Sequence, residues 1–538
     1  MLLRALCFAL VLSPAYQPAL DSISADALRG DLSFLSSDAL EGRDTPSRGL
    51  DTASDFIAAE FRKAGLKPGG DNGYFQTADF LVRTPNVEGF IFELSQHGRT
   101  LRLNADELKI EAAHSVDLIH APLVKSDRDD DGGRQEWANR VVITDRSGAA
   151  RHIKSAAAVI LFDRHPEPNA EARPQLLDPA SPETPGPPCF TIHGPAAEKF
   201  YHSLQGDGAV ASIHLGQPRE RHTPLRNVVA ILPGSDPRLK DTCVILSAHY
   251  DHLGMKPASA TGDRIYNGAN DNGSGTVSVI EIAAALAKLN PHPRRSIIFV
   301  TFFGEEEGLL GSTYYSRHPL FPLARTVANL NLEQLGRTDA KDGPQVNTLS
   351  MTGEAYSDLT AYVEAAGRAT GVKVRRTGAN SEFFFSASDN YPLAKAGVPS
   401  ETLVVAYEFP DYHAVGDEWN KIDYNNLARV DRTIAAATLL LADSLTAPHR
   451  SESSGAAPFR RKTRDGPSSL NKIYHKLCSL GARPQGTFPI LRRLSHVLGQ
   501  PEFPGLICGE MWMLRHVGIP FVLKPMSAAI RSLIERLY

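Results

Sequence analysis

The sequence predicts an α/β protein whose mixed sheet is flanked by helices and which carries an inserted β-rich domain. From residue 226 onward, apolar strand-like segments alternate with a helical segment, as in NVVAILPG, CVILSAHYDH, VSVIEIAAALAKL and SIIFVTFFG. Such alternation is typical of a sheet covered by helices. A stretch of short strands and a Pro-rich loop interrupts the chain earlier. The length of 538 residues exceeds what one hydrophobic core usually supports, so we expect more than one folded unit.

The first residues have the pattern of a secretory signal peptide. Arg4 precedes an apolar run at residues 5–12, and small residues follow at Ser13 and Ala15. This run is far too short to span a bilayer. We therefore expect residues 1–19 to be a signal peptide, no integral membrane span, and a secreted or periplasmic protein. A buried N-terminal helix and a wrongly chosen start codon are the alternatives.

The segments that follow are expected to build the main domain in two pieces. Residues 20–114 begin with helical periodicity in LRGDLSFLSSDALEGR and LDTASDFIAAEFRKAG, and continue with strand-like runs such as FLVRTPNVEGFIFEL. Residues 115–218 contain the short strands RVVIT, AAAVILFD and CFTI, which indicate the inserted β-rich domain. Residues 219–446 then hold the alternating α/β core.

The charge balance changes sharply near the C-terminus. Residues 447–538 hold 14 Lys plus Arg and 5 Asp plus Glu, a net charge of +9, so residues 1–446 carry −13 of the total of −4. We interpret the final segment as a basic linker and tail of unassigned role. No long basic stripe runs through residues 1–446, so nucleic acid is not an expected partner.

Polar clusters follow the strands of the predicted core, where ligands bind in sheets of this kind. They are SAHYDH, NGANDNGSG, GEEEGLLGS, NLNLEQLG and DYHAVGD. Taken singly, a surface turn at His249, a helix N-cap at Asp271 or a solvated acidic turn after Gly304 would explain them. Three adjacent glutamates at the end of a buried strand are nevertheless unfavourable unless cations neutralise them. Together the clusters supply two histidines and several carboxylates, the mixed donor set that suits zinc.

The order of the motifs resembles that of a known family. HYDHLG, NGANDNGSG, GEEEGLLGS, NLNLEQLGR, SDNYPLAKAGVPS and DYHAVGDEWNKID occur as in the co-catalytic two-zinc metallopeptidases, which include secreted bacterial aminopeptidases and glutamate carboxypeptidases. The likeness covers most of residues 22–446. It implies the zinc exopeptidase fold, two Zn²⁺ ions per chain and a peptide substrate. The inserted segment resembles a protease-associated domain.

The resemblance also implies a ligand set. One zinc is expected on His249 and Glu306, the other on Glu333 and His413, with Asp271 bridging the two. Asp251 is expected to orient His249 through its second ring nitrogen.

The chain departs from the family pattern at three places. Glu333 stands where the family commonly has Asp, so its carboxylate reaches one methylene further. Asn390 replaces a usual His, and the tail after Ala447 has no counterpart.

The implied reaction is hydrolysis of the N-terminal peptide bond by a hydroxide shared between two zinc ions about 3.5–4 Å apart. Glu305 is the expected general base, because the register of the following GLLGS assigns Glu306 to the metal. Tyr412 is a candidate for stabilising the tetrahedral oxyanion. The alternatives are a carboxypeptidase of the glutamate carboxypeptidase type, a glutaminyl-cyclase-like acyltransferase and a catalytically inactive relative.

Overall fold

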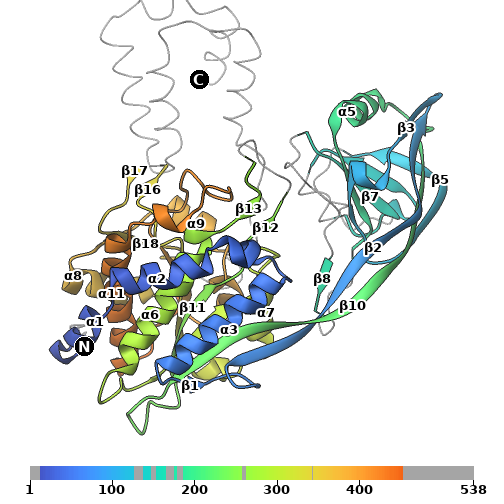
Figure 1. Cartoon of the computed structure of the whole chain (residues 1–538). Coiled ribbons are helices and arrows are strands. Elements are labelled where there is room, and N and C mark those ends of the chain that lie inside the picture. The colour runs from blue at the N-terminus through green and yellow to red at the C-terminus, as the bar shows by residue number, and fades with distance from the viewer. Residues whose placement is uncertain are drawn as a thin grey trace, which may run out of the picture. The chain divides into compact units, whose positions relative to one another are not determined.

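The structure is a computed structural model of the whole chain (Figure 1). The described residues are 12–126, 137–146, 153–164, 175–178, 186–256, 262–341 and 343–451. The acidic loop DRDDDGG and the part of the basic tail after residue 451 lie outside the described residues.

A mixed sheet forms the centre of the main domain, with strand order β19-β18-β20-β15-β11-β14-β10. These strands are β10 (Val210–Leu232), β11 (Cys243–His249), β14 (Ser296–Phe302), β15 (Thr326–Glu333), β18 (Thr348–Met351), β19 (Lys373–Arg375) and β20 (Ser400–Val404). Strand β11 pairs in parallel with both β14 and β15, and β15 pairs in parallel with β20. The carboxyl ends of these four strands therefore meet at one edge of the sheet.

Helices cover both faces of this sheet, so the predicted flanked α/β fold is confirmed (Figure 1). The helices are α2 (Ala25–Leu35), α3 (Arg48–Lys63), α6 (Gly275–Ala287), α7 (Leu310–Arg317), α8 (Leu359–Thr370), α9 (Ala379–Phe384), α10 (Asn390–Lys395) and α11 (Tyr424–Asp443). Val244 and Leu246 of β11 share a core with α2, α3, α6, α8 and α11, whereas Ile245 packs with Tyr315 of α7 and Leu393 of α10. Burial on both faces explains why β11 is an unbroken apolar run.

The β-rich region begins earlier than the expected residue 115. Strand β2 (Phe75–Gln96) pairs with β10 along nearly its whole length. Strand β4 (Leu108–Glu111) pairs with β9, and Phe92 and Leu94 of β2 belong to the core of this region. The remaining elements are β3 (Arg99–Arg102), β5 (Val116–Lys125), β6 (Val141–Thr144), β7 (Ala158–Phe162), β8 (Gln175–Leu177), β9 (Cys189–Ile192) and α5 (Gly194–Ser203).

Short elements complete the described chain. They are η1 (Pro14–Tyr16), α1 (Gln17–Asp21), η2 (Asp38–Arg43), β1 (Lys67–Pro68), η3 (Ala105–Glu107), β12 (Gly254–Met255), β13 (Ile265–Tyr266), η5 (Ala269–Ser274), η6 (Leu323–Arg325), β16 (Asp339–Ala340), β17 (Gly343–Pro344) and η7 (Trp419–Lys421).

Part of the predicted signal peptide packs against the main domain. The Tyr16 hydroxyl donates a hydrogen bond to Asp443 at the end of α11, and Ala19 is buried in the main core. The predicted boundary after residue 19 therefore falls inside α1. Within the described residues, the helices are all too short or too polar to cross a membrane.

Candidate metal centre

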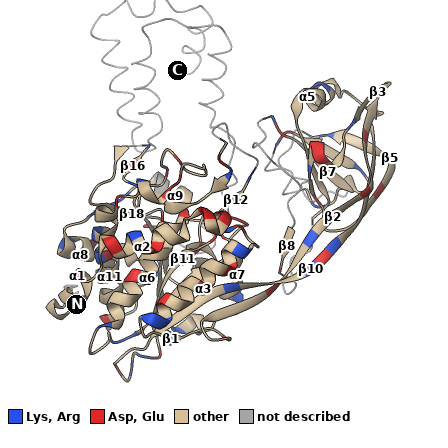
Figure 2. Cartoon of the chain, viewed as in Figure 1, with Lys and Arg blue, Asp and Glu red and all other residues tan. Residues whose placement is uncertain are grey.

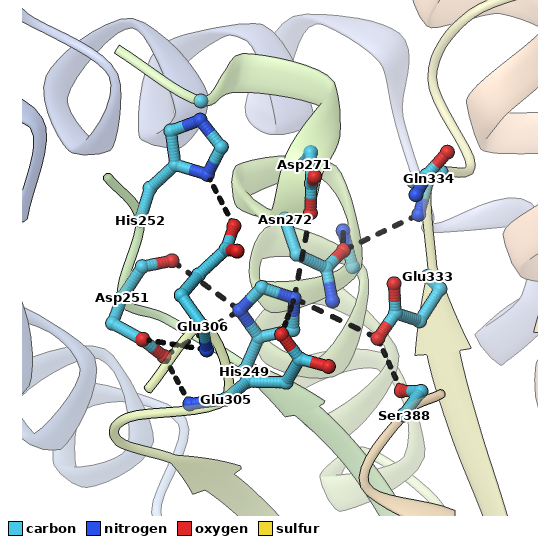
Figure 3. Close-up of polar contacts among 12 residues, drawn as sticks. His249, Asp251, His252, Asp271, Asn272, Glu305, Glu306, Glu333, Gln334 and Ser388 are labelled. Carbon is cyan, nitrogen blue, oxygen red and sulfur yellow. Dashed lines mark hydrogen bonds and ion pairs between the residues drawn. The ribbon is translucent and has the colours of Figure 1, made fainter. Parts of the chain in front are cut away.

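The polar clusters predicted from the sequence meet at the carboxyl edge of the sheet (Figure 3). His249 is the last residue of β11, and Glu333 is the last residue of β15. Glu305 and Glu306 follow β14, and Asp271 lies in η5, the turn that leads into α6. The parallel pairing of the strands explains how segments far apart in the sequence reach one place.

His249 is buried with its two ring nitrogens in different surroundings. Nε2 lies 3.5 Å from Asp271 Oδ1, 3.6 Å from Glu333 Oε1 and 3.9 Å from Glu305 Oε2, and it has no hydrogen-bond partner among the described residues. Nδ1 lies 3.3 Å from the Asp251 carbonyl oxygen and 3.5 Å from its Oδ1. Asp251 therefore faces one nitrogen, while the other points into a cluster of carboxylate oxygens.

A second group lies on the other side of Asp271. Its Oδ2 is 3.1 Å from His413 Nε2, which is 3.4 Å from Glu306 Oε2. The other Glu306 oxygen, Oε1, is 2.8 Å from Nδ1 of His252, a buried residue to which the sequence analysis gave no role. The two oxygens of Asp271 thus face two different histidines.

This grouping differs from the expected pairing of ligands. The sequence predicts one zinc on His249 and Glu306 and the other on Glu333 and His413. In the structure, His249 instead lies beside Glu333, and His413 lies beside Glu306. The reason is how far each glutamate lies from the end of its strand. Strands β11 and β15 are parallel neighbours in a register that pairs Ser247 with Asn331, which brings their last residues together. Glu306 lies beyond the end of β14, in the turn that the His413 loop reaches.

Hydrogen bonds hold the carboxylates and their backbone in place. The Asp251 carboxylate accepts the backbone N–H groups of Glu305 at 3.1 Å and of Glu306 at 3.3 Å. The Asp417 carboxylate accepts the backbone N–H of Asp271 at 3.0 Å. Ser388 donates to Glu333 Oε1. Outer partners of this kind orient the ligands of a metal site.

The electrostatics of the two groups differ. Burial raises the pKa of Glu305 well above its usual range, and burial raises the pKa of Glu333 to about 8, although His249 offsets part of this rise. Burial would also raise the pKa of Glu306, but hydrogen bonds from His252 and His413 hold it at about 2. Negative charge is therefore poorly compensated on the His249 side, where a cation would relieve it.

Two further residues from the sequence analysis have definite surroundings. The Tyr412 ring stacks on the His413 ring, with centroids 4.0 Å apart, and 39% of Tyr412 is exposed. Its role at the oxyanion stays a prediction. Asn390 is buried, accepts from Thr402 Oγ1 at 2.9 Å and donates to the Phe385 carbonyl at 3.0 Å. Asn390 therefore bonds to β20 and the segment before α10.

The donor atoms fit zinc. Two ligand atoms each about 2.1 Å from a tetrahedral zinc lie roughly 3.4 Å apart, close to the distances around His249 Nε2 and His413 Nε2. Among the described residues, His249, Asp271 and Glu333 form one set of convergent donor atoms, and His252, Asp271 and Glu306 form another. Separations near 3.5 Å are long for hydrogen bonds, which explains why the buried His249 Nε2 has none.

Comparisons with known proteins match this part of the chain. Residues 227–438 match the family model described as Peptidase family M28. The chain is 30% identical over 203 residues to aminopeptidase YwaD of Bacillus subtilis, covering 36% of this chain and 40% of that protein. It is 30% identical over 215 residues to the probable glutamate carboxypeptidase VP8 of Zea mays, covering 36% of this chain and 27% of that protein. The matched part thus spans less than half the length of these relatives.

Two solved structures share the fold over more of the chain. An aminopeptidase from Aneurinibacillus sp. strain AM-1 superposes with a TM-score of 0.55 at 18% identity, covering 78% of this chain and 95% of that one. BSAP, a zinc aminopeptidase from Bacillus subtilis, superposes with a TM-score of 0.50 at 20% identity, covering 77% of this chain and 94% of that one. Their coverage extends well beyond residues 227–438.

Proposed function

We propose that this chain is a zinc metallopeptidase of family M28, whose model matches residues 227–438, and that it is a secreted two-zinc aminopeptidase. One observation carries the proposal. The two oxygens of Asp271 face Nε2 of His249 and Nε2 of His413, at 3.5 and 3.1 Å. A carboxylate that faces two separate imidazoles suits a bridge between two cations.

His249 and Glu333 would hold one zinc, and Asp271 would contribute an oxygen to each ion. For the other zinc we propose His413 with Glu306 and not His252, because His413 Nε2 lies 3.1 Å from Asp271 and 3.4 Å from Glu306, whereas His252 bonds to the other Glu306 oxygen. Bound zinc supplies a Lewis acid that polarises the scissile carbonyl and lowers the pKa of a water molecule. Glu333 keeps the oxygen chemistry of the usual Asp, and Ser388 supports the longer side chain by donating to Oε1.

Glu305 is the proposed general base. Its Oε2 lies 3.9 Å from His249 Nε2, beside both groups of donor atoms, and its backbone N–H is fixed by Asp251. It takes a proton from the attacking water and returns that proton to the leaving amine. Because burial raises the pKa of Glu305, the side chain is suited to holding the proton between these transfers. Tyr412 remains the candidate for stabilising the oxyanion.

Aminopeptidase activity is the first choice because, at equal identity of 30%, the match covers 40% of the relative named an aminopeptidase and 27% of the probable glutamate carboxypeptidase. Carboxypeptidase activity is the second candidate. A panel of aminoacyl reporters, N-blocked peptides and γ-glutamyl peptides separates the two. We expect cleavage of free aminoacyl reporters only. Cleavage of N-blocked peptides would instead favour the carboxypeptidase.

Chelation tests the dependence on metal. We expect a zinc chelator to abolish hydrolysis and added Zn²⁺ to restore it, with about two zinc ions per chain in the restored protein. Activity that is indifferent to chelators would contradict the proposal. N-terminal sequencing of the protein from an exporting host tests secretion, and retention of Met1 inside the cell would contradict it.

A further inference from the structure

A buried arginine lies beneath the candidate metal centre. Arg43 ends η2, far from residues 227–438 in the sequence, and only 1% of it is exposed. Its Nε donates to the Tyr250 carbonyl at 2.8 Å. Nη1 donates to the Asn267 carbonyl at 2.8 Å and also to the Leu35 carbonyl, and Nη2 donates to the Gly268 carbonyl at 2.9 Å. In the described residues, its hydrogen-bond partners are thus all backbone oxygens.

These partners flank two proposed metal ligands. Tyr250 directly follows His249, and Asn267 and Gly268 lie just before Asp271. The backbone of Arg43 contributes as well, because its carbonyl accepts the N–H of His252 at 3.2 Å. One residue therefore joins the loop after β11 to the loop before α6.

The two loops are packed against each other at this point. A Cβ on Gly268 would lie 2.4 Å from the His252 ring, and Gly268 adopts a φ of +54°. A small change in the distance between the loop after β11 and the loop before α6 would therefore displace both His252 and Asp271. Five donors in a rigid planar fork can fix several carbonyls at once, which a lysine or an apolar side chain cannot do.

Burial of a charge is costly unless its surroundings compensate it. Burial lowers the pKa of Arg43 to about 10, and the carboxylates of Asp251, Asp417, Asp271 and Glu306 offset part of this effect by favouring its charged form. An apolar side chain of similar size would leave the backbone carbonyls that accept from Arg43 without these donors. Its place among the site's carboxylates further indicates a role in that site.

We propose that Arg43 is a positioning residue of the metal centre, holding the two loops at the separation in which His249 and Asp271 face the same cation. This inference rests on the proposed zinc site. It makes the segment around η2 part of the centre, although that segment lies outside the matched family region.

Zinc affinity of Arg43 variants tests the proposal. Arg43→Met removes the charge and the donors at similar length, and Arg43→Lys keeps the charge and a point donor but loses the planar fork. Arg48→Met is a control at an exposed position of the same segment. Zinc affinity is measured in the full chain by competition with a chromogenic chelator, beside the thermal unfolding of the metal-free protein. We expect a 10- to 100-fold weaker zinc affinity in Arg43→Met, an intermediate loss in Arg43→Lys and no change in the control.

The outcomes separate positioning from packing. A folded Arg43→Met protein with zinc affinity within twofold of the wild type would overturn the proposal, even if its unfolding temperature fell. If Arg43→Met does not fold, Arg43→Lys decides by the same criterion. Because no substrate is present, failure of the proposed function is separate. A wild-type protein whose zinc affinity depends on Arg43 but which cleaves no peptide contradicts only the peptidase assignment.

Discussion

Two groups of carboxylates crowd together in this molecule, and the difference between them indicates what defines a metal site. One is the centre at the strand ends. The other lies on helices and consists of Asp31 of α2, Glu60 of α3 and Glu281 of α6. Figure 2 shows Asp and Glu residues in red along the chain. Burial and the neighbouring carboxylates raise the pKa of Asp31 to about 7, much as burial raises that of Glu333 to about 8. Crowded, perturbed carboxylates are therefore common to both.

The two groups differ in what compensates the charge. On the helices, Lys63 pairs with Glu60 at 2.9 Å, and the carboxylates are only half-buried. At the strand ends, His249 is fully buried, and its Nε2 faces three carboxylates without a hydrogen bond among the described residues. A buried imidazole nitrogen left open toward converging oxygens thus distinguishes the proposed metal site from an ordinary acidic surface.

Removing that imidazole should have the largest effect. We expect His249→Ala to lower zinc affinity by more than about 100-fold, beyond what loss of an outer partner causes, and to abolish hydrolysis. The control is His222→Ala, which removes an exposed histidine that lies 2.8 Å from Asp79. Zinc content after dialysis measures the effect. Full zinc content in His249→Ala would remove this residue from the ligand set.

Removing the proposed base should separate activity from metal binding. We expect Glu305→Gln to lower kcat/KM by about 10²- to 10⁴-fold with zinc content unchanged, because Glu305 belongs to neither set of convergent donor atoms. Glu307→Gln, two residues along the same acidic run, is the matched control. Steady-state kinetics beside metal analysis measure both quantities. A fully active Glu305→Gln enzyme would eliminate the proposed base.

A smaller effect is expected at His252, which donates from Nδ1 to Glu306 Oε1. His252→Phe keeps the ring and removes the donor, so we expect zinc affinity to fall by about 10-fold. His252→Asn keeps a donor at similar reach and should lose less. Competition with a chromogenic chelator measures both affinities. Equal affinities for the Phe variant and the wild type would show that His252 does not orient Glu306.

The sequence could predict which motifs meet, because motifs that follow parallel strands converge at one edge of a sheet. It could not predict how they pair. That His249 lies with Glu333 follows from the register of β11 and β15, which brings their last residues together, whereas Glu306 lies beyond the end of β14. Motif order along the chain does not reveal this register. The start of the β-rich region was also misplaced, because β2 continues without a break from the main sheet into that region.

The supporting residues were harder to predict than the proposed ligands. His252 lies within the HYDHLG motif, but only the structure shows that it contacts one oxygen of Glu306. Arg43 precedes its partners Tyr250 and Asn267 by about 200 residues, and its contacts are with backbone carbonyls. Side chains that bind backbone leave no complementary residue type in the sequence, so spacing rules cannot find them.

The helical carboxylates give the smallest expected effect and test the other side of the comparison. The pKa of Asp31 is about 7 in the folded protein and 3.8 in the absence of perturbation. The folded state therefore binds this proton more tightly, and stability falls as pH rises from about 4 to about 7. Asp31→Asn removes that penalty, so we expect it to stabilise the protein at pH 8. Because Asp31 is partly exposed, solvent reduces the gain to about 1–2 kcal/mol.

Urea unfolding of wild type and Asp31→Asn at pH 8 and pH 4 measures this gain, which should be nearly absent at pH 4. Asp26→Asn, at an exposed position in the first turn of the same helix, should give no stabilisation at either pH. Zinc should leave the difference in unfolding free energy between wild type and Asp31→Asn unchanged, because the helical carboxylates belong to neither set of convergent donor atoms found among the described residues. A gain that disappears when Zn²⁺ is added would mean that these carboxylates also bind metal, and the distinction drawn from His249 would fail.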